Sequence, residues 1–172
     1  MGIIPETKDW LWVTGRSCPD CGFDPAGVTP ATVGPALRAA VPRWQQVLAR
    51  PQARERPDDA TWSALEYACH VRDVCDLFRT RLGLMLEQDN PGFSDWDADA
   101  AAVQGRYGEQ DPAVVAGQFG AAATAAAAAF ETVAPGQWQR PGLRGNGTTF
   151  TVTTLGSYFL HEVVHHMYDV GA

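Results

Sequence analysis

The sequence predicts an all-α protein built as a four-helix bundle. Four segments carry the caps or the apolar spacing of helices of three turns or more, and no convincing pair of strand patterns accompanies them. No repeat recurs at a fixed period. The chain has 172 residues and a hydrophobic content of 45%, which suffices for one compact domain with a core. We therefore predict a single domain over residues 1–172.

The segment that precedes the first predicted helix, residues 1–28, shows no sustained period of either kind. It carries Trp10, Trp12 and a C-x-x-C pair formed by Cys18 and Cys21. No second C-x-x-C pair exists to complete a four-cysteine zinc site, so we interpret this segment as an irregular structural strap. The alternative is a redox-active or thiol-exchanging pair.

The first two helices are predicted from their start signals. Thr29 supplies a capping hydroxyl and Pro30 suits the first turn, and the apolar pattern that follows continues to Leu48. A charged, proline-bearing loop comes next. Thr61 is then expected to cap the second and longest helix, which runs to about Gln88.

The second half of the chain supplies the other two helices. The acidic segment 93–110 is predicted to be a long loop between the second and third helices. Asp-Pro at 111–112 starts an alanine-rich helix that ends near Val133. The glycine-rich segment 135–149 indicates a turn or short hairpin, and the fourth helix follows over residues 151–170.

Charge and hydropathy narrow the class of function. The formal net charge of −7 leaves no basic surface of the kind that neutralises phosphates, which argues against nucleic acid as a partner. We expect no membrane span, because no sufficiently long apolar stretch is evident, and no signal peptide. A soluble cytoplasmic protein follows from these expectations.

Histidines are few and unevenly placed. The chain has four, and three of them lie within six residues of the fourth helix. His161 and His165 are one turn apart on one face, about 6 Å between Cβ atoms, so both imidazoles can reach one ion. His70 lies on an apolar row of the second helix, where a buried imidazole needs a partner. Two facing helices could bring these three imidazoles together around a divalent metal with one open position.

The residues 161–165 also match the H-E-x-x-H pattern of zinc peptidases, in which Glu162 would be the base. We disfavour that interpretation because it leaves His70 without a role and the chain offers no sheet to line a substrate cleft. Cys69 adjoins His70, but neighbours in a helix point about 100° apart, so it is expected to lie in the core.

The order of four helices, the segment ACHVRD around His70, and the H-x-x-x-H-H motif of His161, His165 and His166 resemble the DinB superfamily. The resemblance covers residues 29–170. It implies a DinB-like bundle in which His70, His161 and His165 bind the metal. This superfamily includes metal-dependent thiol transferases and the N-terminal domain of mycothiol-dependent maleylpyruvate isomerase.

By this resemblance the chain is expected to be a metal-dependent thiol S-transferase that conjugates mycothiol to an electrophilic small molecule, as in detoxification. The thiolate is the nucleophile, and zinc favours loss of the thiol proton. His166 is the candidate catalytic residue that accepts this proton or orients the thiol. Arg140, Arg144 and Tyr158 are the candidate residues that bind the thiol cofactor.

Two rival functions stay open. One is an isomerase or hydrolase that uses metal-bound water. The other is a non-enzymatic, metal-binding stress protein. Zn²⁺ is the first choice of metal, and Ni²⁺, Mn²⁺ and Fe²⁺ are the alternatives, since imidazoles suit several divalent ions. A homodimer also stays open, because bundles of this family often pair and the alanine-rich third helix would permit close contact.

Overall fold

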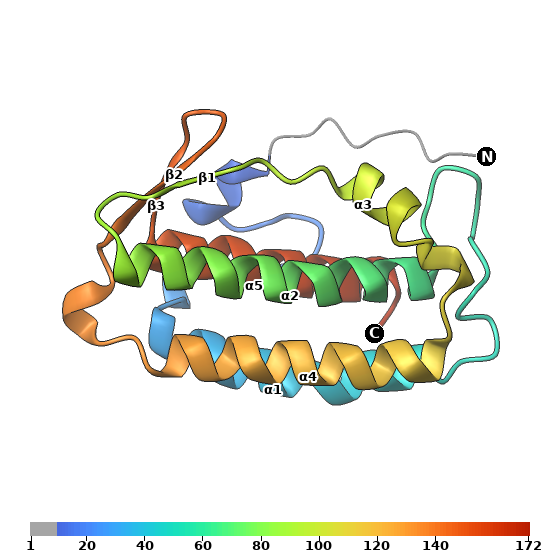
Figure 1. Ribbon diagram of the computed structural model, residues 1–172. Coiled ribbons are helices and arrows are strands. Elements are labelled where there is room, and N and C mark those ends of the chain that lie inside the picture. The colour runs from blue at the N-terminus through green and yellow to red at the C-terminus, as the bar shows by residue number, and fades with distance from the viewer. Residues whose placement is uncertain (1–9) are drawn as a thin grey trace.

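Residues 10–172 are described by the computed structural model, so the first nine residues of the predicted strap lie outside the described part. Four long helices form the bundle: α1 (Pro30–Leu48), α2 (Ala64–Glu87), α4 (Pro112–Glu131) and α5 (Val152–Asp169). Helices α2 and α5 lie side by side in one layer, and α1 and α4 form the layer beneath them (Figure 1). Each helix of one layer packs on the other layer.

Local capping explains where the helices begin. Helix α1 begins after Thr29, as the sequence predicts, and the Thr29 amide donates to the Thr32 hydroxyl at 2.9 Å. Helix α5 begins after Thr151, whose hydroxyl accepts from the Thr154 amide at 3.1 Å. The predicted cap of α2 at Thr61 is wrong. Ser63 is the cap because its hydroxyl accepts from the Glu66 amide, and the Glu66 carboxylate accepts from the Ser63 amide in return.

The core between the two layers is built on aromatic side chains. Trp44 of α1 contacts Phe119 of α4, with ring centroids 5.8 Å apart. Phe159 of α5 contacts Phe78 of α2 at 5.0 Å and Phe130 of α4 at 5.9 Å. All five rings are buried. Every helix of the bundle therefore contributes to one continuous core, which fixes the rotation of α5 about its axis.

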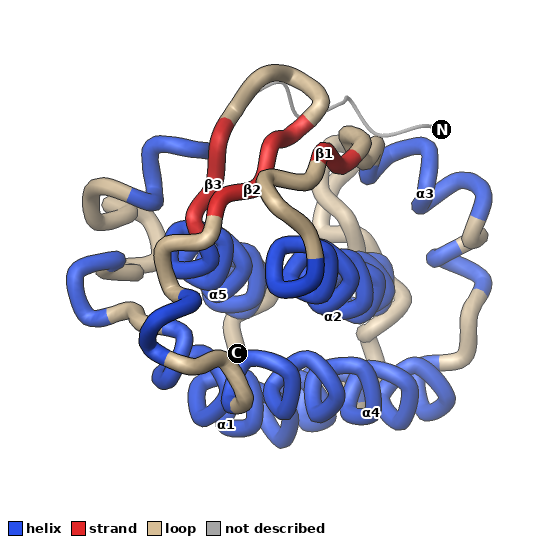
Figure 2. The backbone as a smooth tube through the Cα atoms, turned by 60° about the vertical axis from the view of Figure 1, so that its left-hand side comes forward, coloured by secondary structure: helices blue, strands red, loops and turns tan. Residues whose placement is uncertain are grey.

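The all-α prediction needs a correction, because a small three-stranded sheet covers one end of the α2 and α5 layer (Figure 2). The predicted hairpin is present as β2 (Pro141–Arg144) and antiparallel β3 (Thr149–Thr151). It gains a parallel third strand, β1 (Gly92–Phe93), from the segment that was expected to be loop. The rest of that segment includes a short helix, α3 (Ala98–Gln104).

Helix α4 is long and apolar enough to cross a membrane by length and composition, so the expectation that no stretch reaches this limit is wrong for α4. Its apolar side chains have another explanation in the structure. Phe119, Ala123 and Phe130 are fully buried in the bundle, where α4 packs against α1 and α2. One face of α4 therefore belongs to the core, and 39% of its apolar window is buried.

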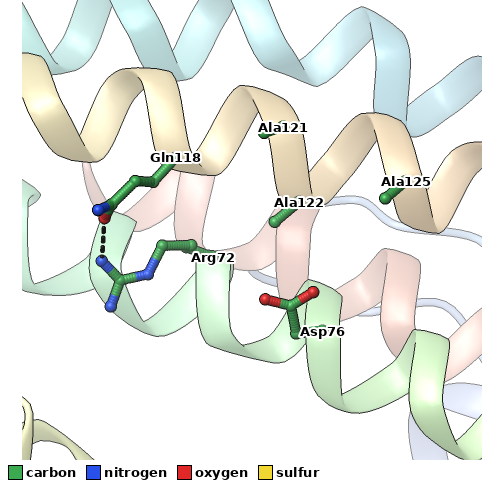
Figure 3. A pocket seen from close by; sticks show the side chains of 6 residues that line it. All are labelled: Arg72, Asp76, Gln118, Ala121, Ala122 and Ala125. Carbon is green, nitrogen blue, oxygen red and sulfur yellow. Dashed lines mark hydrogen bonds between the residues drawn. The ribbon is translucent and has the colours of Figure 1, made fainter.

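An open groove lies between α2 and α4 (Figure 3). Arg72 spans it and donates a hydrogen bond of 2.7 Å to the Gln118 side chain. The groove is lined by Arg72, Asp76, Gln118, Ala121, Ala122 and Ala125. None of the histidines lines this groove, so the candidate metal ligands lie elsewhere in the molecule.

Candidate metal centre

Helix α5 carries two pairs of side chains that could bind a metal ion, on adjacent faces. His161 and His165 form one pair at i and i+4, and Glu162 and His166 form the next pair. Successive residues in an α-helix are rotated by about 100°, so the two pairs cannot face the same neighbour. In the structure each pair meets a different segment of the chain.

The pair Glu162 and His166 faces His70 of α2. The Nε2 atom of His70 lies 3.3 Å from Glu162 Oε2, and the Nε2 atom of His166 lies 3.5 Å from the same oxygen. One ligand atom from each of the three side chains lies within 4.8 Å of the others. Two imidazoles and one carboxylate are a common ligand set for catalytic zinc.

An outer hydrogen bond orients His166. Its Nδ1 lies 2.8 Å from Asp169 Oδ2, and a carboxylate can only accept, so Nδ1 carries the hydrogen and donates it. The Nε2 atom of His166 is thereby directed toward Glu162 and His70. Such an outer carboxylate fixes the ring of a metal-binding histidine and raises its basicity.

The charges in this cluster shift the pKa values in opposite directions. Burial lowers the pKa of His166, but the hydrogen bonds to Asp169 and Glu162 outweigh it and raise the value to about 9. Burial raises the pKa of Glu162, and its contacts with His166 and His70 outweigh this and hold the pKa well below its ordinary value. For His70, burial dominates and lowers the pKa. At neutral pH these shifts favour an ionised Glu162 carboxylate beside a protonated His166.

Aromatic rings surround the cluster. Trp96 stacks on His70 at 5.4 Å between ring centroids, and Trp62 lies 5.5 Å from the same ring. Tyr67 lies 4.9 Å from His166. These three aromatic side chains are only partly buried, so apolar surface reaches solvent beside the polar cluster. A few converging polar groups within an apolar wall are typical of small-molecule sites.

The other pair on α5 faces the strap that precedes α1. His161 and His165 lie with Cys18 and Cys21, and one ligand atom from each of the four lies within 4.8 Å of the others. His161 is buried, and its pKa falls to about 4 because of burial and the neighbouring His165. The three predicted metal ligands are therefore divided: His70 belongs to one cluster, and His161 and His165 belong to another.

The sequence model of the DinB superfamily matches residues 36–170. The chain belongs to the DinB superfamily. A search of curated proteins finds no match for this superfamily member. Among solved structures it is similar to YfiT from Bacillus subtilis, described as "a probable metal-dependent hydrolase with an unusual four-helix bundle topology". The sequence identity is 17%, the similarity covers 81% of this chain and 82% of that one, and the TM-score is 0.71.

In this DinB-superfamily member, the cluster of His70, Glu162 and His166 is suited to bind a divalent cation. The donor set has the composition of a zinc site with three protein ligands, and the three side chains converge from two helices. The Nδ1 atom of His70 is buried and has no hydrogen-bond partner among the described residues, so only Nε2 of that ring is engaged. We name these three residues and their carboxylate partner Asp169 the candidate metal centre.

Arg140, which is predicted to bind the thiol cofactor, is held at the far end of α2 from the candidate metal centre. Arg140 donates to the Met85 and Gln88 carbonyls at 2.5 and 2.7 Å, and Met85 lies about 22 Å along α2 from His70 at about 1.5 Å per residue. Arg144 donates at 2.6 Å to Asp95, the residue before Trp96, and its predicted contact with the thiol cofactor stays a prediction. Both arginines hold the sheet end of the molecule together.

Tyr158 lies closer to the candidate metal centre along its helix than Arg140 does along α2. It lies one turn before Glu162 on the same row of α5, and its ring stacks on Phe78 at 5.8 Å. It is half-buried. Its predicted contact with the thiol cofactor stays a prediction.

Sequence reasoning did not place Glu162 in the cluster with His70, and it did not identify Asp169 as the outer partner of His166. A signal for Glu162 was present, because Glu162 and His166 have the same i, i+4 spacing as His161 and His165. Asp169 lies three residues after His166, a spacing at which helical side chains also meet. His166, predicted as a proton acceptor, lies where a ligand would lie.

Proposed function

We propose that the chain is a metal-dependent enzyme that holds one divalent cation, zinc in the first instance, between His70, Glu162 and His166. One observation carries this proposal: two imidazole Nε2 atoms, from α2 and α5, converge on the same carboxylate oxygen at 3.3 and 3.5 Å. Three protein ligands leave a coordination position open, as in catalytic zinc sites and unlike closed structural ones.

The reaction we propose is S-transfer from a small thiol, mycothiol, to an electrophile. A cation at this centre would supply an open position at which a thiol loses its proton more readily. His166 keeps its ring orientation through the Nδ1 hydrogen bond to Asp169. Trp62 and Trp96 flank His70, exclude water from one side of the centre and offer apolar surface to the electrophile.

Hydrolysis is the second candidate, because YfiT, which shares the fold, is described as a probable metal-dependent hydrolase. The same three ligands would then favour loss of a proton from water. The two candidates differ in one measurable property: the transferase consumes a thiol and the hydrolase does not.

The test is conjugation of mycothiol to monochlorobimane by the zinc-loaded chain, run beside a panel of esters and amides without thiol. We expect thiol-dependent conjugation that is lost in His70→Ala and Glu162→Gln. Glu87→Gln is the matched control, since Glu87 is exposed at the end of the same α2. Thiol-independent turnover of the panel would replace the transferase by the hydrolase. Tight metal binding with no turnover of either kind would favour the metal-binding stress protein.

A further inference from the structure

The C-x-x-C pair of the strap and the H-x-x-x-H pair of α5 are not used by the proposed reaction. We propose that Cys18, Cys21, His161 and His165 bind a second zinc ion, in a closed structural site that fastens the strap to α5. Two thiolates and two imidazoles are the ligand set of Cys2His2 zinc sites, and both spacings lie within the ranges such sites use.

The distances suit a tetrahedral ion. With Zn–S of about 2.3 Å and Zn–N of about 2.0 Å, a sulfur and a nitrogen bound to one zinc ion in tetrahedral geometry are about 3.5 Å apart. Cys18 Sγ lies 3.7 Å from His165 Nδ1. All four ligand atoms already lie within 4.8 Å of one another, so small side-chain adjustments would close the site.

The burial of His161 is a second, independent observation. Its residue is 2% exposed, and among the described residues neither ring nitrogen has a hydrogen-bond partner. A buried polar group without a partner costs about 1–3 kcal/mol, and buried histidine rings are normally satisfied. A zinc ion would satisfy one nitrogen of this ring. Cys18, at 1% exposed, is equally shielded from solvent.

The strap is folded to present both thiols together. The Cys18 amide donates to the Phe23 carbonyl at 2.8 Å, and the Gly22 amide donates to the Cys18 carbonyl at 3.0 Å. Gly22 has a φ of 73°, a left-handed conformation that glycine adopts without strain. In residues 10–28, the described part of the strap, this tight turn lies between two short 3-10 helices, Leu11–Thr14 and Pro25–Gly27.

Aromatic side chains of the strap complete the surroundings. Trp10 lies 4.6 Å from the His165 ring and 5.2 Å from the His161 ring, and Phe23 lies 5.5 Å from His161. The outer nitrogen of His165, Nε2, lies 3.8 Å from Asp169 Oδ1. Asp169 thus faces both clusters, and the zinc ion would fix the α5 face from which Asp169 orients His166.

Four protein ligands leave no open position, so this ion would serve stability and not turnover. Binding converts two thiols into thiolates, and the two protons go to solvent. The alternative to zinc binding is a disulfide between Cys18 and Cys21, formed by loss of two electrons and two protons to an external oxidant. The experiment separates the two.

The reduced, metal-free chain is reconstituted with Co²⁺, which reports thiolate ligation by a sulfur-to-cobalt charge-transfer absorption. We expect this absorption in the wild type and its loss in Cys18→Ser/Cys21→Ser. Cys69→Ala/Cys75→Ala is the matched control, because both cysteines are buried in the core and outside either cluster. His70→Ala should keep the absorption while it loses the reaction, so failure of this site and failure of the proposed function are distinguishable.

A second measurement needs no variant. Zinc should protect Cys18 and Cys21 of the folded wild type from alkylation by iodoacetamide, as read from the peptide masses. No charge-transfer absorption in the wild type, or equal alkylation with and without zinc, would overturn the proposal. A Cys18–Cys21 peptide that lacks two hydrogens in the presence of zinc would also overturn it and establish the disulfide.

Discussion

His166 and Asp169 are joined by a hydrogen bond of 2.8 Å between Nδ1 and Oδ2, across one turn at the end of α5. This contact makes Asp169 the outer partner of the candidate metal centre. Loss of such an outer partner lowers metal affinity by about 10- to 100-fold, because the ligand ring is no longer held in place.

We therefore expect Asp169→Asn to weaken zinc binding at the candidate metal centre by about 10- to 100-fold. The measurement is competition with a chromogenic chelator, made in the Cys18→Ser/Cys21→Ser background so that the strap does not contribute. Asp99→Asn on α3 is the control and should leave the affinity unchanged. An Asp169→Asn protein with wild-type affinity would show that His166 does not depend on this carboxylate.

The start of α2 predicts a pH dependence of stability. Burial raises the pKa of Glu66, but the hydrogen bonds from Arg56 and from the Ser63 amide and hydroxyl outweigh it and hold the pKa below its ordinary value. A carboxylate with a depressed pKa stabilises the folded state above its unfolded pKa of about 4.3. This stabilisation is lost as the pH falls through the lower, folded value.

Glu66→Gln should accordingly lower the free energy of unfolding by about 1–3 kcal/mol near neutral pH, since the buried hydrogen bonds to the charged Glu66 carboxylate are weakened. The difference between wild type and variant should shrink as the pH falls from about 4, and should disappear below the depressed folded-state pKa of Glu66, where the wild-type carboxyl is also neutral. Urea denaturation at both pH values measures this. A constant difference across the range would contradict the assignment.

Substitution of Arg140 tests whether this residue stabilises the fold or binds the thiol cofactor. It donates to the carbonyls of Met85 and Gln88, at the end of α2 where backbone acceptors have no helical partner. Arg140→Ala should therefore lower the free energy of unfolding by about 1–2 kcal/mol and leave the KM for the thiol unchanged. Thermal denaturation and steady-state kinetics check the two halves. A raised KM with unchanged stability would restore the role that the sequence predicted.

The helices of the bundle could be predicted because their signals are local. Thr29 and Thr151 lie directly before apolar periods, and the structure starts α1 and α5 at these caps. The strand β1 could not be predicted in this way. It has two residues, Gly92 and Phe93, and exists only because the hairpin 141–151 lies beside them.

The metal ligands show a different limit. The sequence H-E-V-V-H-H contains two interleaved i, i+4 pairs, and nothing local tells which of them faces α2. That choice depends on the rotation of α5, which is fixed by core contacts such as Phe159 with Phe78. The sequence analysis grouped His70 with His161 and His165, whereas the structure groups His70 with Glu162 and His166 of the same helix α5.

The close packing that sets this rotation is itself testable at Gly156, one and a half turns or so before His161 on α5. A Cβ atom at Gly156 would lie 2.9 Å from Val33 Cγ2 and 3.2 Å from Phe130 Cε1, so α5 would have to move away from α1 and α4. Overpacking of this kind costs about 1–3 kcal/mol. We expect Gly156→Ala to lower the free energy of unfolding by that amount and to weaken metal binding as α5 shifts.

Gly117 of α4 is the matched control, because a Cβ atom there meets nothing within 4 Å and the site is exposed. Gly117→Ala should raise the free energy of unfolding by about 0.4–1 kcal/mol, since alanine restricts the unfolded chain and favours helix. Urea denaturation of both variants and zinc competition by the chelator provide the readouts. If Gly156→Ala were as stable as Gly117→Ala and bound zinc equally well, the rotation of α5 would not depend on this contact. The separation of its two ligand pairs would then need another cause.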